Sequence, residues 1–127
     1  MKVAEIYKQF ICFATMINYN NKKFRTTATS ANGSVTAGTV FIYRQDGNMV
    51  TATYTGGNIL SGHLIAIANA DGHLDMRYHH INTSHILMTG HCSSIPEILE
   101  NGKIKLHEEW QWTSGDHARG ESILEEI

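Results

Sequence analysis

Residues 40–81 read VFIYRQDGNMVTATYTGGNILSGHLIAIANADGHLDMRYHHI. Runs of β-branched, aromatic and threonine residues alternate here with turn signals, which are Asp46-Gly47, Gly56-Gly57 and Asp71-Gly72. Pairs such as Asp-Gly favour tight hairpins because glycine accepts a positive φ at no steric cost. The stretch therefore predicts consecutive strands joined by short hairpin turns.

Further turn signals lie on both sides of this stretch, at Asn32-Gly33, Asn82 to His85, Asn101-Gly102 and Ser114 to Gly120. The strands predicted between the turns are Lys23–Ser30, Thr39–Gln45, Met49–Thr55, Leu60–Asn69, Leu74–Ile81, Ile86–Ser93, Lys103–Thr113 and Glu121–Ile127. Short connections imply that sequence neighbours pair. We therefore expect an all-β fold, an eight- to ten-stranded antiparallel up-and-down (meander) β-barrel. The longer connection, Ser94 to Gly102, is predicted to be a loop with a helical turn at Pro96–Leu99.

Composition excludes several classes of protein. The chain has 127 residues, of which 42% are hydrophobic, enough for one core. Its net charge is −2 and no lysine or arginine cluster is present, so we expect no nucleic-acid partner. The apolar stretch Phe10–Ile17 is too short to span a bilayer, so no membrane partner is expected. Cys12 and Cys92 are read as free thiols in a reducing cytosol, which predicts a cytoplasmic location.

Residues 1–20 are predicted to form a segment apart from the barrel domain, 21–127. Apolar residues recur here at helical spacing, and they are Val3, Ile6, Tyr7, Phe10, Phe13, Ala14 and Ile17. A short helix that covers a barrel end is one interpretation, and such a helix could support a homodimer. The other is that Met16 is the natural start and the preceding residues are an extension.

Alternation along each strand sorts residues between the two faces of the sheet. The inner face of the seventh predicted strand carries Ile104, Leu106, Glu108, Trp110 and Trp112. A buried carboxylate must find a partner or stay protonated. Glu108 is therefore either the polar anchor of a ligand in an apolar cavity or a residue at the barrel rim that faces water.

Other inner faces carry Tyr54, Tyr78 and His80. His80 and Tyr54 are candidate partners of Glu108. With Trp110 and Trp112, the tyrosines form an aromatic set that could contact a ligand, although core packing would explain it equally. Alternation does not assign the faces of the second and fourth predicted strands.

Arg77 shares a face with Asp75 and His79. It is a reserve candidate for binding an anionic group, the alternative being an ion pair on the outer surface. The sequence has 8 histidines, but none has a recognised metal-ligand spacing, so no metal site is predicted.

Five segments carry a resemblance: TVFIYRQDG (39–47), ATYTGG (52–57), LDMRYHHIN (74–82), MTGHCSS (88–94) and LHEEWQWTSGD (106–116). They resemble a small bacterial family of lipocalin-like or calycin-like barrels that is often labelled N-acetylglutamate synthase. The label implies acetyl transfer from acetyl-CoA to glutamate. Arg44–Met49 only imitates the pyrophosphate loop of acetyltransferases, since it lies in a predicted hairpin with no helix after it. The residues therefore argue that the label is a misassignment.

The sequence thus predicts a barrel that binds a small, partly apolar ligand and needs no cofactor. Its candidate ligand-binding residues are Tyr54, Arg77, Tyr78, His80, Glu108, Trp110 and Trp112. The alternative is an enzyme, either the labelled acetyltransferase with acetyl-CoA or an acid–base catalyst that uses Glu108 and His80.

Overall fold

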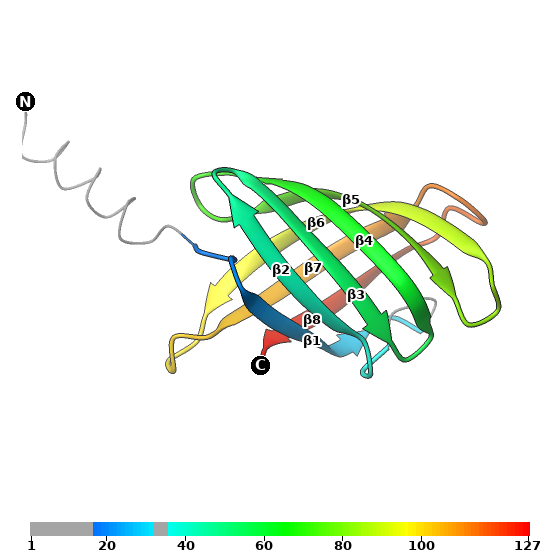
Figure 1. Ribbon diagram of the computed structural model, residues 1–127, viewed down its shortest axis with the longest axis horizontal. Helices are drawn as coiled ribbons and strands as arrows, with labels where there is room; N and C mark the ends of the chain where they lie inside the picture. Colours follow the sequence, from blue (N-terminus) through cyan, green and yellow to red (C-terminus); the bar gives the residue numbers. More distant parts are fainter. Residues whose placement is uncertain (1–16, 32–35) are drawn as a thin grey trace, which may run out of the picture.

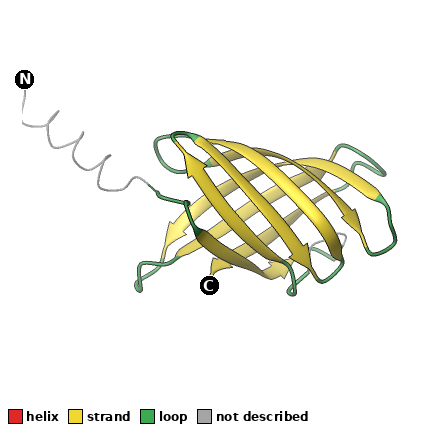
Figure 2. Ribbon diagram, in the orientation of Figure 1, coloured by secondary structure: helices red, strands yellow, loops and turns green. Residues whose placement is uncertain are grey.

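The computed structural model describes residues 17–31 and 36–127. In this part of the chain eight strands close into one barrel in sequence order (Figure 1). The strands are β1 (Lys22–Thr29), β2 (Val40–Asp46), β3 (Met49–Gly56), β4 (Ile59–Ala68), β5 (Leu74–Asn82), β6 (Leu87–Ile98), β7 (Ile104–Trp112) and β8 (Arg119–Glu126). Figure 2 shows strands and loops only among the described residues. The predicted all-β meander barrel is confirmed.

Every strand pairs antiparallel with its sequence neighbour, and β1 closes the barrel by pairing with β8. Closure removes the exposed strand edges that would otherwise template aggregation. The hairpin glycines have the expected conformation, with φ of 61° at Gly47 and 79° at Gly72. The predicted turn at Asn32-Gly33, Cys12 and residues 1–16 of the predicted helical segment 1–20 lie outside the described residues, and residues 17–20 of that segment are not helical. No helix of the described part is long and apolar enough to cross a membrane.

The prediction for residues 94–102 was wrong. Strand β6 continues to Ile98, and Pro96 pairs with Leu106 of β7 instead of starting a helical turn. On its other side β6 pairs with β5, and this pairing ends at Leu74 and Ser94. The last residues of β6, including Pro96, therefore extend beyond β5. Proline is tolerated there because no strand on that side needs its missing N–H.

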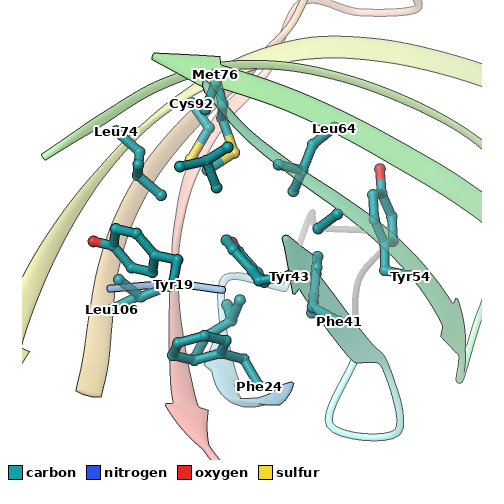
Figure 3. Packing of buried hydrophobic residues seen from close by; sticks show 14 of the residues in the cluster. Tyr19, Phe24, Phe41, Tyr43, Tyr54, Leu64, Leu74, Met76, Cys92 and Leu106 are labelled. Carbon is teal, nitrogen blue, oxygen red and sulfur yellow. The ribbon is translucent and has the colours of Figure 1, made fainter. Parts of the chain in front are cut away.

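One end of the barrel is filled by aromatic side chains, which come from the segment before β1 and from β1 and β2. Tyr19 precedes β1 and is fully buried, and its hydroxyl donates to the carbonyl oxygen of Gly72 at 2.5 Å. Its ring packs against Phe24 and Tyr43, with centroids 6.4 and 5.9 Å apart (Figure 3). This end, where the β2–β3, β4–β5 and β6–β7 turns lie, is the plugged end.

The structure settles the two strands that alternation left open. Phe41 and Tyr43 of β2 face inward, as do Leu64 and Ala66 of β4. Strand β4 was ambiguous because its outer face is also apolar: Ile65 and Ile67 are 54% and 55% exposed. The outer face of β4 therefore exposes apolar side chains to solvent.

Candidate functional site

A cavity of about 40 Å³ remains inside the barrel. It has room for roughly three water molecules, so side chains fill most of the interior. It extends from the middle of the barrel toward the open end, defined here as the end opposite the plugged one. Its lining consists of Thr29, Phe41, Tyr54, Leu64, Met76, Tyr78, Cys92, Glu108, Trp110, Trp112 and Ser122. Five of the seven predicted ligand-binding residues are among them.

Aromatic rings form most of the cavity wall. Phe41 stacks on Tyr54 with centroids 4.7 Å apart, and Trp112 meets Tyr78 edge-on at 5.7 Å. Trp110 lies 5.4 Å from Trp112. Contacting rings of this kind hold one another in place beyond the effect of area burial. The predicted aromatic set therefore both packs the core and faces the cavity.

Glu108 is the charged residue of the lining. Its side chain is only 9% exposed, and its Oε2 atom has no hydrogen-bond partner among the described residues. Burial raises the pKa of Glu108 from 4.5 to about 7, and the Ser94 hydroxyl acts against this rise. The expected partners His80 and Tyr54 form no hydrogen bond with it. The rim interpretation is wrong, because Glu108 lies in the interior between Ser94 and Ser122 of the adjoining strands.

Two further buried hydroxyls, those of Thr26 and Tyr43, lack a hydrogen-bond partner within the described part of the chain, whereas the Ser94 hydroxyl faces the carboxyl group of Glu108. Ser94 is opposite Glu108 in the β6–β7 ladder. Burial, and to a smaller extent the carboxylate of Glu108, raises the pKa of the Tyr43 hydroxyl well above its ordinary value of 10. Orphaned buried polar atoms require an explanation such as ordered water or a ligand.

His80 lies behind the cavity wall. It is 1% exposed, and its Nδ1 atom shares a hydrogen bond of 2.9 Å with the Tyr54 hydroxyl. Its ring also contacts Tyr78 and Trp112, at centroid distances of 6.2 and 5.5 Å. Burial, helped by neighbouring His79, lowers the pKa of His80 to about 4. His80 is therefore a neutral residue that supports Tyr54.

The structure does not bring Glu108 and His80 together as an acid–base pair. His80 pairs with Met88 near the start of β6, whereas Glu108 pairs with Ser94. Met88 and Ser94 are six residues apart on that strand, or roughly 20 Å at the usual rise of a strand. A glutamate and a histidine side chain are too short to bridge that separation.

Arg77 does not face the cavity. It lies on the outer face of β5, and its Nη1 atom donates to Asp75 at 2.8 Å. Both side chains are largely exposed, at 64% and 73%. The surface ion pair weighed from the sequence is therefore what the structure shows. Its position gives Arg77 no access to a ligand inside the barrel.

Sequence reasoning missed the hydroxyl groups around Glu108. Ser94 had been assigned to a loop because of Pro96, and Tyr43 is on a strand whose face was ambiguous. Ser122 was not singled out, although it accepts from the Trp110 indole N–H at 2.9 Å and bonds Thr29 at 2.9 Å. Its position two residues from Leu124 on an alternating strand was the available signal.

Searches among curated proteins and among solved structures found no match to the chain. The family model that matches describes avidin-like proteins and covers residues 17–127. This match agrees with the predicted calycin-like barrel and gives no support to the label N-acetylglutamate synthase. Because it spans nearly the whole sequence and all eight strands, the chain belongs to the avidin-like protein family.

Proposed function

We propose that this barrel binds a small, partly apolar molecule in its interior cavity. The observation that carries the proposal is Glu108, a buried carboxyl group without a hydrogen-bond partner for Oε2, in a cavity lined by aromatic rings. Leaving such a group unsatisfied costs free energy, whereas a ligand with a matching polar group would satisfy it. Apolar walls with a few placed polar groups are typical of ligand sites.

The cavity volume limits the ligand. Pockets for drug-sized molecules measure roughly 300–1,000 Å³, whereas this cavity measures about 40 Å³. Covalently bonded atoms lie closer together than water molecules, so space for roughly three waters takes a ligand of about four non-hydrogen atoms without rearrangement of the walls. Since the best small ligands gain at most about 1.5 kcal/mol per such atom, the dissociation constant would be tens of micromolar or weaker. Larger ligands require side chains of the cavity wall to move.

Family membership supports ligand binding, since avidin-like barrels bind small ligands such as biotin. Biotin itself is larger than the cavity. Its binding would therefore require movement of the aromatic wall, so its affinity can be compared with that of a fragment small enough to fit. We expect it to bind no more tightly than a fragment that fits the existing space.

The native mass of freshly purified protein tests first for a ligand that binds more tightly than this small volume predicts, by movement of the aromatic wall. A reproducible excess over the denatured mass would identify a retained ligand and give its formula weight. Fluorescence provides the second test, because the sequence has only 2 tryptophans and both line the cavity. If no retained ligand appears and no small polar–apolar compound changes the emission up to high millimolar concentration, the proposal is wrong.

An acetyltransferase function is the alternative to test alongside. We expect no release of free CoA when the protein is incubated with acetyl-CoA and glutamate, because residues 44–49 form a hairpin between β2 and β3 rather than a pyrophosphate loop. The predicted homodimer remains a prediction. Sedimentation of the full chain and of a chain that begins at Met16 would test both it and the role assigned to the first residues.

A further inference from the structure

No basic side chain is among the residues that line the cavity with Glu108. On the outer surface Arg77 pairs with Asp75, and His107 contacts Glu97. Titratable groups on other strands and on the segment before β1 interact electrostatically with Glu108. All are neutral when protonated, and they are Tyr19, Tyr43, Tyr54, Tyr78 and Cys92. The pKa of each is raised by burial and by nearby Glu108, so none supplies a positive charge.

The rest of the lining is suited to a cation with an apolar part. Aromatic faces attract cations through the ring quadrupole, and the attraction grows when the cation is desolvated. Phe41, Tyr54, Tyr78, Trp110 and Trp112 supply such rings around the same cavity that Glu108 lines. An anion would meet a carboxylate and no basic side chain, since Arg77 lies outside the barrel.

We propose that the ligand class is a small organic cation, an alkylammonium or amidinium ion with a short apolar group. Its nitrogen would donate to the unpartnered Oε2 of Glu108, and its apolar part would contact the aromatic rings. An ammonium group has three donors and no acceptor. It therefore complements an ionised carboxylate whose Oε2 atom has no hydrogen-bond partner among the described residues. This inference rests on the proposed function and names the chemistry of its ligand.

Three probes of similar size separate the charge from the apolar contact: n-propylammonium, 1-propanol and propionate. Tryptophan fluorescence at pH 8 and constant ionic strength reports their binding to the full chain. At this pH the amine is protonated, and Glu108, with a pKa of about 7, is mostly ionised. We expect propylammonium to bind at least tenfold more tightly than propanol, and propionate to bind least.

The variant Glu108→Gln keeps the shape of the side chain and removes its charge. We expect it to lose the preference for propylammonium while its affinity for propanol stays within a factor of about three. Glu109→Gln is the matched control, since Glu109 is adjacent on β7 but exposed on the outer face, and it should keep the preference. If Glu108→Gln fails to fold, wild-type protein at pH 5 serves instead. At that pH Glu108 is protonated and His80 stays neutral.

Three outcomes would overturn the inference. Equal binding of propanol and propylammonium to the wild type would leave a ligand site with no selectivity for cations, and the proposed function would survive. A preference for propylammonium that persists in Glu108→Gln would assign the cation to another site. Binding of none of the three probes would count against both the inference and the proposed function.

Discussion

Tyr78 lies directly opposite Gly90 in the β5–β6 ladder, and its ring covers that glycine so closely that a Cβ there would collide with it. The same relationship occurs twice more. Tyr54 covers Gly62 across β3 and β4, and Trp110 covers Gly120 across β7 and β8. Each glycine thus gives space for an aromatic ring to lie flat against the wall, a pairing that stabilises glycine positions in sheets. The rings that line the cavity are placed by the glycines opposite them.

Substitution of Gly90 by alanine tests this relationship. The added Cβ would overlap the phenol of Tyr78 and lie 2.8 Å from the carbonyl oxygen of Gln111. We expect Gly90→Ala to lower the free energy of unfolding by about 1–3 kcal/mol, the usual cost of overpacking. His91→Ala, at the neighbouring exposed position, should change it by less than about 0.5 kcal/mol.

A double-mutant cycle with Tyr78→Leu then separates the ring from the backbone. Gly90→Ala should cost less in the Tyr78→Leu background, because the phenol is gone. The part that remains reports the contact with Gln111. Urea unfolding measures the free energy that Gly90→Ala costs in each background. Equal costs would mean that the position of the Tyr78 ring does not depend on Gly90.

Glu108 should make the protein less stable as the pH rises. Its pKa is about 7 in the folded state against an ordinary value of 4.5, so the folded state holds the proton more tightly than the unfolded chain. Stability is therefore lost between pH 4.5 and 7, by about 3 kcal/mol for a shift of this size. Above pH 7 the loss is complete.

The variant Glu108→Gln removes this titration. Its free energy of unfolding should differ little from that of the wild type at pH 4 and exceed it by about 3 kcal/mol at pH 8. Urea unfolding at several pH values measures the difference, and Glu109→Gln is the exposed control. A difference that does not change with pH would show that the folded-state pKa is not raised.

His80 should act in the opposite direction, at acid pH. Its folded-state pKa is lowered from 6.5 to about 4 because burial disfavours the charged ring. The unfolded chain then binds a proton that the folded state does not, so stability is lost as the pH falls from 6.5 to 4, by up to about 3 kcal/mol. His80→Gln should remove this loss. His79→Gln, on the exposed face of the same strand, should retain most of it, because burial is the larger cause of the lowered pKa; if it does not, the acid sensitivity belongs to another group.

The sequence predicted the arrangement of strands better than the contents of the barrel. Turn glycines and alternation along β7 were sufficient to place Glu108, Trp110 and Trp112 inside, because a closed barrel has only two faces. Alternation failed for β4, where Ile65 and Ile67 are apolar but face outward. The last residues of β6 were not predicted because they contain Pro96. A strand tolerates proline where no neighbouring strand needs its N–H, and this depends on where β5 begins, which is not a local property of the sequence.

The size of the cavity and the hydrogen-bond partners inside it were beyond prediction for a different reason. Both depend on how side chains from non-adjacent strands meet across the barrel. His80 was correctly assigned to the inner face, yet its partner is Tyr54 rather than Glu108. The register between strands decides this, and register follows from turn lengths and bulges such as the shift between Ile59 and Ser61.

Ser122 should control the position of Trp110. The indole N–H donates to the Ser122 hydroxyl at 2.9 Å in a buried environment, and Thr29 bonds the same hydroxyl. Ser122→Ala would leave the indole N–H without that acceptor, which typically costs about 1–3 kcal/mol. We therefore expect a loss of stability in this range in urea unfolding, together with a shift of the tryptophan emission.

The cost should depend on the indole. In a Trp110→Phe background no N–H remains to be orphaned, so Ser122→Ala should cost less than about 1 kcal/mol, the remainder reflecting the bond to Thr29. Ser93→Ala, at an exposed position on β6, controls for loss of a surface hydroxyl. If Ser122→Ala costs the same free energy of unfolding with and without the indole, then Ser122 stabilises the fold only through its hydrogen bond to Thr29. The orientation of Trp110 in the cavity would then rest on its contacts with Gly120 and Trp112.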